Sequence, residues 1–320
     1  MALGVAEIAL VSPLGASPSE HVFFHRAEVS PHASGAFTTR DGEALPVHHC
    51  PWIPASRPWP SRIRLLAKQA LARAAPSSKE TPILLVAPRD ALEGEADVAR
   101  FLTLAGHTIV SLRSGSSGYV LALKEAQDLL RREPEVVVLA VDSQIRRPDL
   151  ERWFELRYSA FTRNPLPPSE GAAAMRLVAS PSGPLAGKVH AFAVAESDAR
   201  DDNDLPTDGA ALTRVFAELR FPATVSLAVG PLDVDPLRIR DFHIASVRHH
   251  ANFERAVMPS FEGQIGLFGS AAGLMSAVFA LAWLRHDLPL PHPAGRRVAL
   301  AWARSGDGTV GAALVGDERS

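Results

Sequence analysis

Apolar residues along this chain gather into short runs that alternate with stretches of helical period. The clearest run, 134–142, is nearly continuous and rich in valine, which is typical of a strand covered on both faces. A second run, 5–11, stops at a serine-proline turn and predicts another buried strand. Further strands are predicted at 81–87, 107–112, 170–179, 189–195, 224–229, 298–304 and 309–315.

Helical periodicity separates these strands. Residues 61–75 carry an apolar stripe that includes Ile63, Leu66 and Leu71, with Ser61 as the expected N-cap. Residues 17–59 show no clear period and predict loops with little regular structure. Other helices are predicted at 93–104, 119–131, 149–158, 209–218 and 235–242, and in a long segment ending near Arg285. The alternation of strands and helices predicts an α/β protein with a mostly parallel sheet.

Composition narrows the class of protein. The chain has 320 residues, 47% of them hydrophobic, and a formal net charge of -2, which gives no reason to expect nucleic acid or an anionic membrane as partner. The most apolar stretch, 271–284, is too short to span a bilayer and predicts a buried helix. Cys50 is the single cysteine, and the first residues lack the features of a signal peptide, so we expect a cytoplasmic protein.

Several segments, in the same order along the chain, resemble landmarks of the β-ketoacyl-acyl-carrier-protein synthases, which belong to the thiolase-like superfamily. Val11-Ser12-Pro13-Leu14-Gly15 resembles that family's opening strand and turn, and Gly115-Ser116-Ser117-Gly118 resembles the turn before its nucleophile helix. Three more segments resemble the family's proline-glycine-glutamate motif, its glycine-histidine segment and its last glycine-rich turn; they are residues 164–174, 263–273 and 306–309.

The resemblance implies a five-layered αβαβα fold built of two similar halves, here residues 1–184 with the nucleophile turn and residues 185–320. It also implies dimerisation through a strand near that turn. The chain is shorter than usual members, so some loops around the family's acyl tunnel are expected to be absent.

The resemblance further implies that the residues of condensation are replaced. Condensation needs a thiolate at a helix N-terminus and two imidazoles near the thioester oxygen. The nucleophile position holds Ser116, or Ser117 if the alignment moves by one residue. Val229 stands at the first histidine position and Gln264 at the second. Because all three have changed, we expect the condensing activity to be lost.

Two interpretations of Ser116 stay open. It is either a nucleophile served by another base, with His243, His249 and His250 as candidates, or part of a tight turn with a serine N-cap. Neither a cofactor nor a metal is expected. The sequence His48-His49-Cys50 lacks a second ligand pair with metal spacing.

Three functions follow from these observations. The first is a degenerate synthase that resembles chain-length-factor subunits and shapes the acyl tunnel of an active ketosynthase. The second is a Ser116-dependent acyltransferase or thioesterase. The third is a non-catalytic scaffold, which either binds an acyl group or keeps the fold without any acyl substrate. The partners expected are an active ketosynthase in a heterodimer, or a second copy in a homodimer, and an acyl carrier protein; nucleic acid and membrane are not expected.

Overall fold

A computed structural model of the protein describes residues 2–38, 42, 44–92, 97–146, 150–151, 166–179, 183–199, 207–221, 224–231, 236–286 and 297–317. Within these ranges, hydrogen bonds connect nine strands in the order β3-β2-β4-β5-β1-β6-β9-β8-β7. The strands are β1 (Leu3–Val11), β2 (Pro82–Val86), β3 (Thr108–Arg113), β4 (Glu135–Ser143), β5 (Glu170–Val178), β6 (Gly187–Glu196), β7 (Leu227–Val229), β8 (Val298–Arg304) and β9 (Thr309–Gly316).

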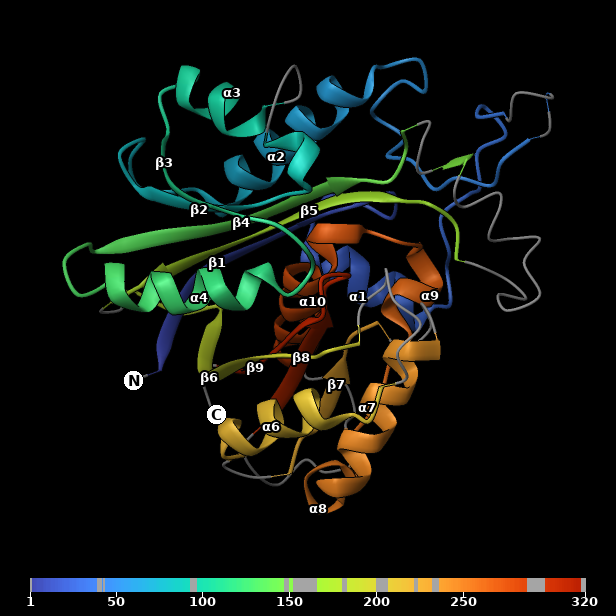
Figure 1. Ribbon diagram of the computed structural model, residues 1–320. Coiled ribbons are helices and arrows are strands. Elements are labelled where there is room, and N and C mark those ends of the chain that lie inside the picture. Colours follow the sequence, from blue (N-terminus) through green and yellow to red (C-terminus); the bar gives the residue numbers. More distant parts are fainter. Residues whose placement is uncertain are drawn as a thin grey trace.

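Helices cover both faces of this sheet (Figure 1). They are α1 (Pro18–Arg26), α2 (Trp59–Ala74), α3 (Val98–Leu104), α4 (Gly118–Leu129), α6 (Ala210–Leu219), α7 (Pro236–Arg248), α8 (His250–Phe253), α9 (Phe261–Ile265) and α10 (Ala272–Arg285). Among the described helices none is long and apolar enough to cross a membrane.

The strands fall into two groups with the same topology. In the first group the order β1-β5-β4-β2-β3 begins with two antiparallel pairs and ends with two parallel pairs. In the second group the order β6-β9-β8-β7 likewise begins with two antiparallel pairs, followed by one parallel pair. A parallel bridge between Leu227 and Val257 occupies the position that corresponds to β3 of the first group. Among the described strands, the two groups are joined where Leu3–Val5 pairs with Gly187–Val189. The expected similar halves are therefore present, while their boundary at 184/185 stays a prediction.

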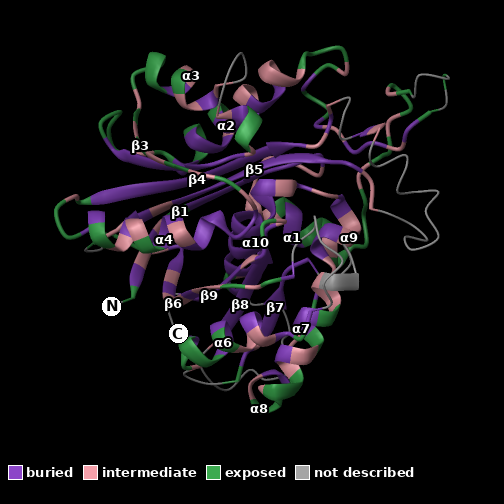
Figure 2. Cartoon of the chain, viewed as in Figure 1, coloured by how far each residue is buried: buried purple, intermediate pink, exposed green. Residues whose placement is uncertain are grey.

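Three apolar clusters fill the space between five layers. One lies between the first group of strands and α2 and α3, and another lies between the second group and α6 and α7. The largest lies between the two groups and contains α4 and α10, and it is almost entirely buried (Figure 2). Every residue of α10 from Ala272 to Leu284 is buried, because this helix lies between the two groups of strands. The order helix, sheet, helix, sheet, helix is the layering of the thiolase-like fold.

Three sequence predictions were wrong: the direction of most strands, the absence of regular structure at 17–59 and the N-cap of the second helix. The sheet is mixed and not mostly parallel, since antiparallel pairs join β4 to β5 and β8 to β9 as well as β1 and β6 to their neighbours. Continuous apolar strands indicate burial on both faces, which is present, but they do not report strand direction.

The second error concerns residues 17–59, where loops were predicted. Helix α1 begins at Pro18, because Ser17 accepts a hydrogen bond from the Glu20 amide and the Glu20 carboxylate accepts from the Ser17 amide. This reciprocal capping box fixes a helix that has little amphipathic period of its own. Helix α2 also begins earlier than expected: Pro58 is its N-cap, and Ser61 lies inside the first turn.

Candidate functional site

The serine turn, residues 114–118, connects β3 to α4. Gly115 has a φ of 77°, a left-handed conformation that favours glycine, and the amide of Gly118 donates to its carbonyl at 3.0 Å. A Cβ atom at position 115 would lie 2.4 Å from the Ser305 hydroxyl oxygen. The turn is therefore pressed against the hairpin between β8 and β9.

Both serines of the turn are bonded to that hairpin. The Ser116 hydroxyl, on a residue with 9% exposure, donates to the carbonyl oxygen of Arg304 at 2.7 Å. The Ser117 amide donates to the Ser305 hydroxyl at 3.0 Å, and the two hydroxyls of Ser117 and Ser305 are themselves hydrogen-bonded. Ser117 occupies the N-cap position of α4, but its side chain makes no capping hydrogen bond. The serines thus fasten the first turn of α4 to the hairpin.

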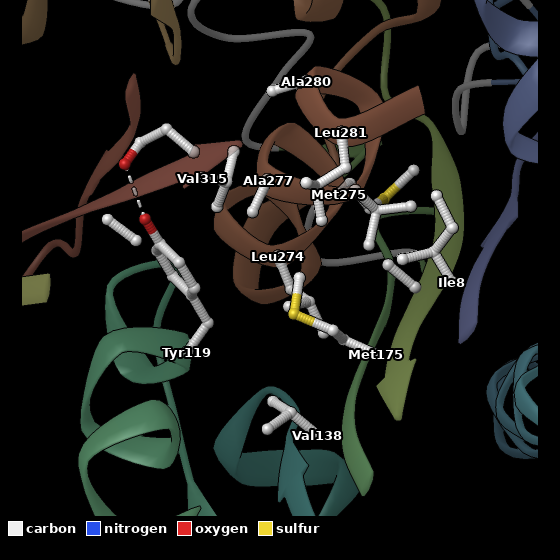
Figure 3. Close-up of a cluster of buried hydrophobic side chains, with 14 of the residues drawn as sticks. Ile8, Tyr119, Val138, Met175, Leu274, Met275, Ala277, Ala280, Leu281 and Val315 are labelled. Atoms are coloured by element: carbon white, nitrogen blue, oxygen red, sulfur yellow. Dashed lines mark hydrogen bonds between the residues drawn. The ribbon is translucent and has the colours of Figure 1, made fainter. Parts of the chain in front are cut away.

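Helix α10 and Tyr119 fill the space beside Ser116. A Cβ atom at Gly273 would lie 2.1 Å from the carbonyl oxygen of Ser116 and 2.6 Å from the Tyr119 ring. The Tyr119 side chain extends from α4 across the central layer. Its phenol donates a hydrogen bond to the carbonyl of Ala301 on β8 at 2.7 Å, which Figure 3 draws as a dashed line. Complete burial raises the pKa of this phenol, although a hydrogen bond opposes the effect, so it stays protonated.

Val229 lies in the same central layer. It is the last residue of β7, is fully buried in the central cluster and pairs with Ala301, the residue whose carbonyl holds Tyr119. Its side chain is apolar, so this position offers neither a proton donor nor an acceptor to the serine turn.

Gln264 is engaged elsewhere. It lies on α9, and its Nε2 donates to the carbonyls of Phe24 at 3.2 Å and Val29 at 2.6 Å. Its Oε1 is hydrogen-bonded to Nδ1 of His25. These contacts bind Gln264 to the carboxyl end of α1 and to the residues that follow it. The structure therefore brings Ser116 and Val229 into one layer, and it shows no contact between Gln264 and either of them in the described part of the chain.

The histidines considered as bases for Ser116 belong to the outer layer of the second half. His243 is on α7 and His250 begins α8, and both are exposed. His249 packs against the Phe216 ring with centroids 5.9 Å apart, and its Nε2 lies 3.3 Å from the Thr213 carbonyl. The strands of the second half stand between this layer and α4 (Figure 1). None of these imidazoles contacts Ser116.

Arg304 is a site residue that the sequence did not predict. Its carbonyl accepts from Ser116, while its fully buried guanidinium binds the Asp241 carboxylate on α7 and the carbonyl of Ala199. Burial raises the pKa of Asp241, although hydrogen bonds from Thr207 and the charge of Arg304 oppose the effect. An arginine at the end of a buried strand, directly before a glycine turn, is the one signal that could have drawn attention to it.

The residues His48 to Cys50 do not form a ligand set. His48 Nδ1 lies 2.7 Å from the carbonyl of Ile265, and the Cys50 thiol is fully buried, which raises its pKa. No group of three or more histidine, cysteine or acidic side chains able to hold a metal occurs among the described residues.

Layering and topology together define a thiolase-like fold, with the serine turn where α4 begins. No protein-family model matches the sequence, and no curated protein matches it. Solved structures do match over nearly the whole chain. The ishigamide ketosynthase/chain length factor has a TM-score of 0.74 at 18% identity, covering 99% of both chains.

Two further structures are similar. A type II ketosynthase in complex with its acyl-carrier protein gives a TM-score of 0.76 at 14% identity, covering 98% of this chain and 99% of that one. An oxazolomycin ketosynthase domain from Streptomyces albus JA3453 gives 0.75 at 15% identity, covering 99% of this chain and 75% of that one. This chain therefore has the fold of ketosynthases and of a chain length factor.

Proposed function

We propose that this chain is a ketosynthase-like protein of polyketide- or fatty-acid-type biosynthesis that does not perform condensation itself. In this proposal it acts in the cytoplasm as a partner subunit similar to a chain length factor. The observation that carries the proposal is the hydrogen bond from the Ser116 hydroxyl to the carbonyl of Arg304.

That hydrogen bond matters because of where the proton goes. A serine becomes a nucleophile when an adjacent base takes its proton, and a peptide carbonyl is not such a base. No hydrogen bond joins Ser116 to a histidine within the described residues. His21 is hydrogen-bonded to Ser12, and His25 is hydrogen-bonded to Gln264. A buried serine held in this way supports the helix and is not activated.

The open edge of β3 supports the partner role. In the described sheet β3 pairs with β2 alone, and it runs directly into the serine turn. Val110 and Leu112 on this strand are 41% and 43% exposed. An unprotected apolar edge strand is a ready template for pairing with another chain. We therefore place the subunit contact at β3, with an active ketosynthase in a heterodimer or a second copy in a homodimer.

A segment rich in cations and free of acidic residues supports the acyl carrier protein as the further partner. Residues 51–79 contain no aspartate or glutamate, although the whole chain has a net charge of -2. Buried Arg62 is neutralised by Glu170, and the remaining cations of this segment are Arg57, Arg64, Lys68, Arg73 and Lys79. A carrier protein docking here would present acidic side chains, because complementary charge speeds encounter and fixes orientation.

The experiment combines assembly with activity. The chain is expressed with an active ketosynthase encoded beside its gene, and the complex is examined by native mass spectrometry and by a condensation assay. Changing Val110→Lys or Leu112→Lys should weaken the dimer by at least about tenfold, because a charge enters the contact. Val247→Lys on α7 is the matched control, since Val247 is 74% exposed and far along the chain from β3.

The expected result is condensation by the complex and none by the isolated chain. Condensation by the isolated chain would contradict the loss of activity, and fully dimeric β3 variants would contradict the contact. A protein that binds no acyl substrate is the second candidate, and the filling of the space beside Ser116 by Tyr119 and α10 favours it. A chain that stays monomeric with every ketosynthase offered would support this second function.

A further inference from the structure

A surface hollow of about 260 Å³ lies away from the serine turn, between the end of β1, the start of α1 and the end of α2. Pro13 and Leu14 form one apolar wall, and Pro51 and Trp52 form the other. The charged side chains at its margin are Glu20 and Arg73. Neither Ser116, Val229 nor Gln264 contributes to it.

The part of the hollow formed by Pro13 and Leu14 is rigid. The amides of Ser12 and Gly15 donate to each other's carbonyls, at 2.9 and 3.1 Å, and close the turn. Beneath it the Ser12 hydroxyl lies 2.6 Å from Nε2 of His21, whose Nδ1 lies 2.7 Å from the carbonyl of Ser17. Both side chains are fully buried. The hollow therefore exists before any ligand binds, which reduces the entropy lost on binding.

The two charged groups at the margin differ. The Glu20 carboxylate accepts from the amides of Ala16 and Ser17 at 2.9 and 3.0 Å. Burial works against its ionisation, but these hydrogen bonds outweigh burial and lower its pKa. Its charge is therefore already stabilised by the start of α1. Arg73 is exposed and makes no hydrogen bond or ion pair within the part of the chain that the structure describes. The guanidinium is the group with unused donors.

The aromatic wall adds a second contact. Trp52 is 42% exposed, which is unusual for the largest apolar side chain, and its ring borders the hollow. Aromatic groups stack favourably on such a ring in offset or edge-to-face arrangements. A planar anion also pairs with a guanidinium through two parallel hydrogen bonds.

We propose that this hollow binds a small anion with a flat apolar body, of the arylcarboxylate class. The carboxylate pairs with Arg73 and the ring lies against Trp52. The volume restricts the ligand to about one ring, since it is below the ~300–1,000 Å³ that drug-sized ligands occupy. The hollow contains none of the residues of the serine turn or of β3. Arg73 also belongs to the cationic segment, but benzoate binding is measured without a carrier protein or a ketosynthase, so its failure is distinguishable from a failure of the proposed function.

Benzoate is the probe, and binding is measured by isothermal titration calorimetry and by tryptophan fluorescence. We expect a Kd in the millimolar range, about -4 kcal/mol. Arg73→Gln and Trp52→Ala should each weaken binding at least tenfold. Lys124→Gln removes an exposed cation on α4, outside the hollow, and should leave the Kd unchanged. Circular dichroism confirms that each variant is folded.

Neutral benzamide and cationic benzylamine separate charge from shape. Both should bind at least tenfold more weakly than benzoate. Equal binding of benzamide, unchanged binding by Arg73→Gln, or tighter binding of benzylamine would each overturn the assignment. The absence of saturable benzoate binding up to about 20 mM, some twentyfold above the expected Kd, would overturn it as well.

Discussion

Replacing Gly273 with alanine tests how closely α10 packs against the first turn of α4. The added Cβ atom would lie 2.1 Å from the Ser116 carbonyl oxygen and 2.6 and 2.8 Å from two carbons of the Tyr119 ring. Separations under 3.0 Å force something to move. The nearest atom is backbone, and the Tyr119 hydroxyl is fixed to Ala301, so neither neighbour can turn aside without breaking a contact.

The magnitude follows from two opposing effects. Overpacking a close-packed core costs about 1–3 kcal/mol, and contact with backbone on one side and a fixed ring on the other puts this site at the upper end. Alanine regains up to about 1 kcal/mol through its better helix propensity. We expect a net destabilisation of about 2 kcal/mol, a large part of a domain's stability of about 5–15 kcal/mol.

Urea unfolding followed by circular dichroism measures the change. Gly183→Ala is the matched control, because a Cβ atom there meets nothing within 4 Å, and its stability should stay within about 0.5 kcal/mol of the wild type. A Gly273→Ala protein as stable as this control would refute the close approach of the two helices.

Three further predictions concern stability. Glu170→Gln should destabilise the protein by about 3–5 kcal/mol in the same assay, because it leaves the Arg62 guanidinium, 1% exposed, without its charged partner. Glu125→Gln breaks the partly exposed pair with Arg113 and should change stability by less than about 1 kcal/mol; equal effects would show that burial does not set the difference. Burial lowers the pKa of His21 from 6.5 to about 4. Between these pH values the unfolded chain binds a proton at His21 and the folded protein does not, so stability should fall as pH drops from 6.5 to 4. The full loss is about 3 kcal/mol, and a His21→Gln variant with the same pH profile as the wild type between these values would contradict it.

Regular elements with strong local signals were predictable from the sequence. Strand β8 was predicted at 298–304 and is observed as Val298–Arg304, because an uninterrupted apolar run before a glycine turn has few alternatives. Helix α1 was missed, since its signal is a capping box and not a hydrophobic stripe. The five layers were predictable because several segments resemble those of the ketosynthases and follow in the same order along the chain.

The site was predictable in part. The glycine-serine sequence placed Ser116 at the start of a helix, where the structure has it. Its hydrogen-bond acceptor lies 188 residues further along the chain, and no local pattern reports a contact of that separation. The same holds for Gln264, whose neighbours on α1 are 239 and 240 residues away. Its assignment as a histidine position stays a prediction.

Acylation of Ser116 is the most direct test of the claim that this serine has a structural role, through its hydrogen bond to the Arg304 carbonyl, and is not a nucleophile. The wild-type chain and Ser116→Ala are incubated with acyl thioesters of several lengths, beside an active ketosynthase as positive control, and peptides are examined by mass spectrometry. We predict acyl adducts on the control enzyme and none on the peptide containing Ser116. An adduct there that disappears in Ser116→Ala would contradict the account. Acylation would require a base that takes the proton of Ser116, and the Arg304 carbonyl cannot act as that base.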